Sequence, residues 1–148
     1  KRISKENHLG TINPIVDIYN SVSLSHAMPC GGEDIDRMEG NLLLTRADGD
    51  EPFYVIGSDE NQPPFPGELV YKDDRGAVCR CWTWREAKRT MLTEETKNAM
   101  LCCELIDLQR WEDFLDVLEC LKRETEEKLG GKAQIKILDI DHREAELL

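Results

Sequence analysis

Hydrophobic residues recur at helical spacing in two stretches of the chain. In "NPIVDIYNSVSLSHAMP", Asn13 is a typical N-cap, Pro14 suits the first helical position, and apolar side chains follow at helical spacing as far as Val22. Apolar residues keep the same spacing over residues 111–129, until a Gly-Gly pair ends the pattern. The pattern therefore predicts one helix near each end of the chain.

The middle of the chain is patterned like strands. "NLLLTRA" and "PFYVIGS" are predicted strands joined by a turn over residues 48–50, and "ELVYK" and "AVCRCWTW" form a predicted hairpin around the turn over residues 73–76. "NAMLCCELI" suits a buried strand, and "AQIKILDI" alternates like a final one. Strands grouped between helices indicate an α+β fold with an antiparallel or mixed β-sheet core and flanking helices.

Chain length favours a single domain over residues 1–148, with the C-terminal helix and strand at 111–141. The first ten residues, "KRISKENHLG", resemble the last turns of a helix that ends at Gly10. A helix rarely begins at residue one, so we expect that part of the natural protein lies upstream.

Composition narrows the class of protein. With 40% hydrophobic and 33% charged residues and no apolar run near ~20 residues, the sequence is typical of a globular protein that does not span a membrane. The six cysteines lie mostly in apolar runs, and no secretory signal opens the chain, which favours a reducing cytoplasm. The three histidines stand far apart, and the cysteines lack zinc spacing, so we expect neither a metal nor a cofactor.

One short segment departs from the acidic character of a chain whose formal net charge is -11. Between residues 80 and 90 it combines two tryptophans and four basic residues with a single carboxylate: Trp82, Trp84, Arg80, Arg85, Lys88, Arg89 and Glu86. Strand alternation would place Val78, Arg80, Trp82 and Trp84 on one face. This face is either a stacking platform flanked by cations for phosphate or carboxylate, or core whose arginines pair with acidic residues.

"PCGGEDID" is a second candidate. Gly31 and Gly32 predict a loop that could form a backbone nest for a ligand, or simply a turn in which Asp34 caps a one-turn helix. Glu33, Asp34 and Asp36 resemble a cluster for a hard cation but lack the wider spacing of a calcium loop, so we predict no bound cation.

The ordered set "NPIVDIYNSVSL", "PCGGEDID", "RADGDEPF", "PGELVYKDD", "CRCWTWREAKRT" and "LTEETKNAML" resembles the stand-alone relatives of the tRNA-binding and editing domain (the B3/B4 module) of the bacterial phenylalanyl-tRNA synthetase beta subunit. The match runs from Asn13 to about Glu104. The resemblance implies a trans-acting deacylase that hydrolyses mischarged aminoacyl-tRNA without a metal. The implied partner is the aminoacylated acceptor end of tRNA, with no DNA and no membrane. A module that binds tRNA or an amino-acid-like ligand without catalysis is the alternative, and a protein-interaction domain is a third.

The resemblance and the local chemistry together select a set of site residues. The catalytic candidates are Asp34, Glu68 and Glu86, and the substrate-binding candidates are Asn20, Gly31, Gly32, Arg46, Arg80, Trp82, Trp84, Arg85, Arg89 and Thr90. We expect Arg80, Trp82, Trp84, Arg85 and Arg89 to form a basic and aromatic wall, and the wall to share one cleft with the Gly-Gly segment. Gly31 stands where the editing domain has a histidine, and Thr83 where close relatives have asparagine, so a histidine-assisted water does not transfer to this chain.

Overall fold

The computed structural model of the protein describes residues 10–147. The helix expected for the first ten residues therefore lies almost entirely outside the described residues. The chain divides into two compact units. One contains the described residues up to Gly31 together with those from Leu101 onward, and the other is Gly32–Met100.

Two helices build the first unit, as the hydrophobic spacing predicts. Helix α1 (Pro14–His26) begins after Asn13, whose side chain accepts a hydrogen bond from the Val16 amide at 3.0 Å. Helix α2 (Trp111–Leu129) follows the short 3-10 helix η3 (Leu108–Arg110) and ends at Gly130, which has a left-handed φ of 69°.

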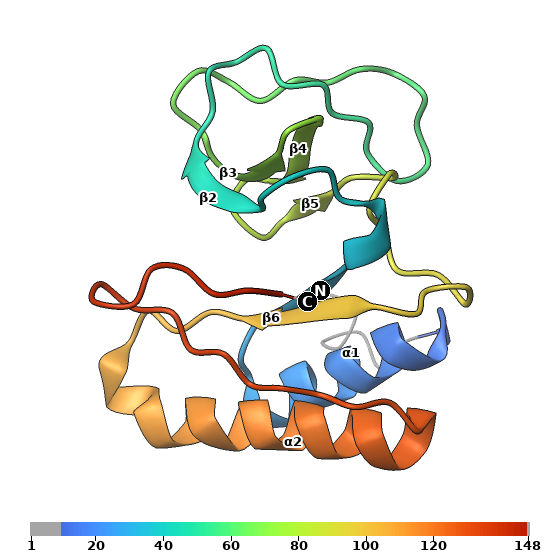
Figure 1. The fold of residues 1–148 in the computed structure, drawn as a ribbon, viewed down its shortest axis with the longest axis vertical. Coiled ribbons are helices and arrows are strands. Elements are labelled where there is room, and N and C mark those ends of the chain that lie inside the picture. Colours follow the sequence, from blue (N-terminus) through green and yellow to red (C-terminus); the bar gives the residue numbers. More distant parts are fainter. Residues whose placement is uncertain (1–9, 148) are drawn as a thin grey trace. The chain divides into compact units, whose positions relative to one another are not determined.

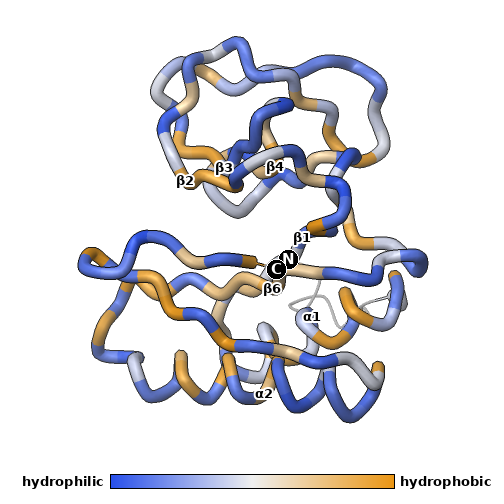
Figure 2. Tube along the Cα trace, viewed as in Figure 1, coloured by the Kyte–Doolittle hydropathy of each residue, from blue (hydrophilic) through white to orange (hydrophobic). Residues whose placement is uncertain are grey.

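The two helices pack against each other within this unit (Figure 1). Their shared core consists of five buried side chains: Val22, Met28, Phe114, Val117 and Leu121. Apolar and polar residues alternate along α2 (Figure 2), so the helix keeps one apolar stripe for this contact. Burial of that stripe stabilises the pair.

The second unit is built on a four-stranded sheet with the order β2-β3-β4-β5 and antiparallel pairing throughout. Its strands are β2 (Leu43–Arg46), β3 (Leu69–Asp73), β4 (Gly76–Arg80) and β5 (Arg85–Glu86). Strand β1 (Cys30–Asp34) leads into the 3-10 helix η2 (Ile35–Arg37), and β1 pairs with β6 (Ala99–Cys103). Two antiparallel sheets with helices confirm the α+β prediction.

Strand β4 is the centre of the second unit, because all five of its residues are buried. The β3–β4 hairpin forms at the predicted turn, where the Asp73 carboxylate accepts hydrogen bonds from the amides of Arg75 and Gly76. Gly76 has a φ of 152°, and a Cβ there would lie 2.4 Å from the Pro52 carbonyl oxygen. Only glycine allows this close approach.

Two local predictions around β1 and β2 are wrong. The Gly-Gly segment is part of β1 rather than a loop, although the one-turn helix capped by Asp34 is confirmed. "PFYVIGS" forms only the isolated bridges Tyr54↔Asn61 and Val55↔Ala87, because β2 pairs with β3 instead.

The strand expected at "AQIKILDI" is also absent from the described residues, where positions 133–139 have no regular secondary structure. Leu138 and Ile140 are largely exposed. Alternation of apolar and polar residues suits a strand, but a strand forms only where a partner edge accepts its backbone hydrogen bonds.

Candidate functional site: the aromatic turn and its buried ion pair

The segment between β4 and β5 is a tight reversal, which we call the aromatic turn (residues 81–84). Cys81 and Trp82 adopt left-handed φ angles of 52° and 62°. Such angles are rare for side chains larger than asparagine and cost about 1–2 kcal/mol per residue. Tertiary contacts hold the turn in place, including a 3.0 Å hydrogen bond from the Trp82 amide to the Leu69 carbonyl.

The turn overturns the prediction that the two tryptophans share a strand face with Arg80. Strand β4 ends at Arg80, so the alternation stops before Trp82. Trp84 is 83% exposed, whereas Trp82 is half-buried and its Nε1 is buried without a hydrogen-bond partner. Thus one tryptophan is exposed to solvent and the other is half-buried.

Arg80 and Glu68 form a buried ion pair that is hydrogen-bonded to the aromatic turn. Arg80 Nε donates to Glu68 Oε1 at 3.0 Å, and Arg80 Nη2 donates to Glu68 Oε2 at 2.7 Å. Glu68 also accepts from the Cys81 amide at 2.9 Å and the Phe65 amide at 3.0 Å. The Arg80 guanidinium and these two amides hold the pKa of Glu68 at about 2. Glu68 is therefore saturated with donors and poorly suited to be a general base.

Aromatic rings surround the arginines of this cluster. The Arg80 guanidinium carbon lies 5.5 Å from the Phe53 ring centroid and 5.7 Å from that of Phe65. Arg85 lies 5.6 Å from the Phe53 centroid and donates to the Gln62 side chain. Phe53 is buried, but Phe65 is 75% exposed.

Glu68 connects the proline-rich loop to the aromatic turn, because it accepts the amides of both Phe65 and Cys81. Two exposed aromatic side chains, Phe65 and Trp84, thereby lie on segments tied to one carboxylate. Neither Phe65 nor Gln62 was among the residues selected from the sequence. The only sequence signal for them is the loop "NQPPFPG", which places an aromatic among prolines.

Arg89 occupies different surroundings from Arg80 and Arg85. Its guanidinium donates two hydrogen bonds to Asp73, at 2.8 and 2.7 Å, and a third to the Arg37 carbonyl. It lines a shallow groove of about 410 Å³, and Arg80 and Arg85 are not part of that lining. The lining residues are Asp36, Arg37, Met38, Glu39, Arg75 and Arg89. Arg89 is therefore the one residue of the expected basic and aromatic wall in the lining of this groove.

The remaining catalytic candidates also have structural partners. Asp34 accepts from the Asp36 amide at 3.1 Å and from the Thr96 hydroxyl at 2.7 Å, as expected of a cap. Glu86 accepts a 3.5 Å contact from the Cys79 thiol and lies against Glu33. The pKa of Glu33 is raised to about 10. Burial of its carboxyl group is the largest cause, and the neighbouring Glu86 carboxyl group is the second. Sequence reasoning missed Glu33 as a partner of Glu86.

The other substrate-binding candidates are spread over several elements. Asn20 lies in α1, and Gly31 and Gly32 lie in β1. Arg46, at the end of β2, donates to the Gly67 carbonyl at 3.0 Å. Thr90 is completely buried, and its hydroxyl has no hydrogen-bond partner.

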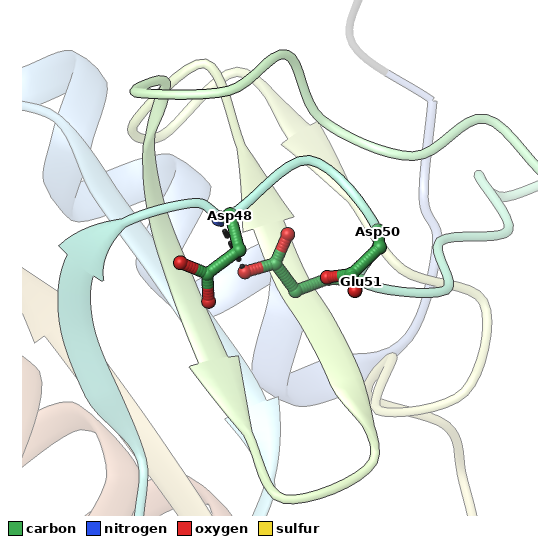
Figure 3. A group of neighbouring side chains, drawn as sticks. All are labelled: Asp48, Asp50 and Glu51. Carbon is green, nitrogen blue, oxygen red and sulfur yellow. Dashed lines mark hydrogen bonds between the residues drawn. The ribbon is translucent and has the colours of Figure 1, made fainter.

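Three acidic side chains, Asp48, Asp50 and Glu51, lie together on the loop after β2 (Figure 3). Glu51 accepts from the amides of Asp48 and Gly49 and from Lys72 Nζ at 2.8 Å. Its carboxylate thus closes the loop and neutralises Lys72. This cluster has an architectural explanation and supplies no evidence for a metal site.

Most of the chain matches a known protein family. The family described as "B3/4 domain" matches residues 1–112. The phenylalanine–tRNA ligase beta subunit of Ruegeria pomeroyi is 36% identical over 94 residues, which are 63% of this chain and 11% of that protein. Those of Fusobacterium nucleatum and Mycoplasma genitalium are 32% and 34% identical over 90 and 88 residues, covering 61% and 59% of this chain and 11% and 10% of theirs. The chain spans about a tenth of the length of these relatives. Among residues 10–147, no helix combines the length and the hydrophobicity of a membrane-spanning segment.

Proposed function

The chain belongs to the B3/4 domain family, and from this premise we propose that it binds the aminoacylated acceptor end of tRNA through the aromatic turn. The observation that carries the proposal is the left-handed pair Cys81 and Trp82, which leaves Trp84 83% exposed beside Arg85. Strained backbone concentrates at functional sites, since the rest of the fold must hold it. Curated relatives of the chain are subunits of a tRNA ligase.

The chemistry of this surface suits the single-stranded end of an RNA. An exposed aromatic ring stacks on any base, which contributes about 1–3 kcal/mol per base. Phe65 offers a second exposed ring on a loop that Glu68 ties to the turn. Arg85 contacts the Gln62 amide and the Phe53 ring, and both are neutral groups that leave its charge available for phosphate. With a net charge of -11, the protein would contact few phosphates, so affinity should decline gently with salt.

Beyond binding, we propose that the chain hydrolyses the ester bond of a mischarged aminoacyl-tRNA. An aminoacyl ester is activated, so a positioned water and donors to the oxyanion are sufficient. The three carboxylates selected as catalytic candidates have structural partners, as described above. We therefore assign activation of the water to the substrate's own ribose hydroxyl rather than to a protein base. Binding without hydrolysis is the alternative.

The test uses a panel of mischarged tRNAs, with binding and release of amino acid measured separately. Trp84→Ala should weaken binding about tenfold or more, as expected for one lost stacking partner, without changing the unfolding midpoint. Trp111→Ala is the matched control, because it removes a partly exposed tryptophan from the other unit. Equal affinity of the parent and of Trp84→Ala for tRNA would refute the proposal that the aromatic turn binds it. Binding without release of amino acid would refute the hydrolase and leave the binding module.

A further inference from the structure

Glu33 and Glu86 place two carboxyl groups in contact inside the second unit. They come from different strands, β1 and β5, and lie within hydrogen-bonding reach of each other. Glu33 is only 5% exposed, and the Oε2 atoms of both residues are buried without a donor. An ionised carboxylate only accepts hydrogen bonds, so two in contact repel unless a proton lies between them.

Among the described residues, the one cation that acts on Glu33 compensates only a small part of the pair's negative charge. Arg89 is the cation that acts on Glu33, but its guanidinium is bound to Asp73 and to a backbone carbonyl. From β4, the Cys79 thiol faces the pair and donates weakly to Glu86 Oε1. Thr90, after β5, lies beside Glu33, and its buried hydroxyl forms no well-aligned hydrogen bond.

We propose that Glu33 and Glu86 share one proton at neutral pH, and that this proton holds β1 against β5 in the second unit. A proton between the carboxyl groups turns a repulsive contact into a charge-assisted hydrogen bond. It also satisfies buried oxygens that have no other donor. Aspartic proteases share a proton between two carboxyl groups for the same electrostatic reason.

The shared proton makes the stability of this unit depend on pH in a defined direction. The folded state keeps a proton that the unfolded chain releases above the ordinary glutamate pKa of about 4.3. Stability from this group is therefore complete below that value and is lost as pH rises toward the raised pKa of the folded state. For one proton, the unfolding equilibrium constant increases by at most about tenfold per pH unit.

The sharing also bears on function, independently of the proposed tRNA binding. Glu86 would then help to hold in place the strand that also carries Arg85. Failure of the tRNA-binding proposal would leave this inference unaffected, because its test measures protonation and stability in the absence of RNA.

Glu33→Gln is the decisive variant, because its amide can donate to Glu86 without a titrating proton. We expect the full chain with Glu33→Gln to keep the parent circular dichroism spectrum at pH 6. In urea between pH 5.5 and 9, each pH unit multiplies the unfolding equilibrium constant by some factor. That factor should be up to about tenfold smaller for Glu33→Gln than for the parent. Glu39→Gln is the control, since it changes an exposed carboxylate and should preserve the parent slope. Identical slopes for parent and Glu33→Gln would overturn the proposal.

Infrared spectroscopy tests the protonation state directly and does not depend on the variant folding. At pH 7 the parent should show the stretching band of a protonated carboxyl group, although free glutamate and aspartate are ionised at this pH. The band should vanish in Glu33→Gln and persist in Glu39→Gln. A parent spectrum without this band at pH 7 would overturn the proposal even if Glu33→Gln failed to fold.

Discussion

Arg80 and Glu68 are joined by two parallel hydrogen bonds of 3.0 and 2.7 Å, in a pair whose side chains are 4% and 11% exposed. Bidentate geometry of this kind is the strongest form of an arginine–carboxylate contact. Because the same carboxylate accepts the amides of Phe65 and Cys81, the pair supports both segments that carry exposed aromatic rings. The most basic part of the sequence thus contributes architecture as well as surface charge.

Replacing Glu68 by Gln should destabilise the second unit strongly. The variant leaves the Arg80 guanidinium buried without its counter-charge, and breaking a buried pair costs about 3–5 kcal/mol. Glu39→Gln is the matched control, because its partner Arg75 is 3.0 Å away but both side chains are more than half exposed, and exposed pairs contribute about 0–1 kcal/mol. Urea unfolding measures both variants. A cost below about 1 kcal/mol for Glu68→Gln would contradict the architectural role.

Acid should destabilise the protein through Glu51 and Glu68. Both folded-state pKa values are lowered to about 2, Glu51 chiefly by Lys72 and loop amides and Glu68 chiefly by Arg80. Their contribution is therefore complete above the unfolded pKa of about 4.3 and is lost as pH falls from there toward 2. Urea unfolding between pH 5 and 2.5 should show this decline, with a smaller slope in Glu68→Gln. A variant with the parent slope would show that Glu68 has no such linkage.

Cys81→Gly should stabilise the aromatic turn. Glycine accepts a φ of 52° without the steric cost of about 1–2 kcal/mol, against an entropic penalty of roughly 0.5–1 kcal/mol. The net gain should be about 0.5–1 kcal/mol in urea unfolding. Cys79→Gly, two residues earlier in the buried strand β4, should instead lose stability, because it removes a packed side chain from extended backbone. Equal losses in both variants would show that the turn is not strained.

Local chemistry was sufficient to predict several elements from the sequence. Asn13 with Pro14 marks the start of α1, Gly130 ends α2, and Asp73 with Gly76 forms the β3–β4 turn, because each signal depends on hydrogen bonds and φ angles within a few residues. The cap at Asp34 belongs to the same class.

The sequence alone also identified the segment that carries the candidate site, since Trp84, Arg85 and Arg80 stand out in an acidic chain. What it could not determine is the direction in which these side chains point. The left-handed pair at Cys81 and Trp82 is locally unfavourable, so the pattern of alternation predicted a continuing strand.

Only the tertiary structure decided the partners of the charged groups and the edges of the sheet. Glu68 meets Arg80 and Glu33 meets Glu86 because strands distant in sequence bring them together. Likewise "PFYVIGS" and "AQIKILDI" have the alternation of strands, but neither finds a partner strand along its length within the described chain. Periodicity states which face of a segment is apolar, whereas backbone pairing and buried charge depend on what lies opposite, and that is a property of the folded chain.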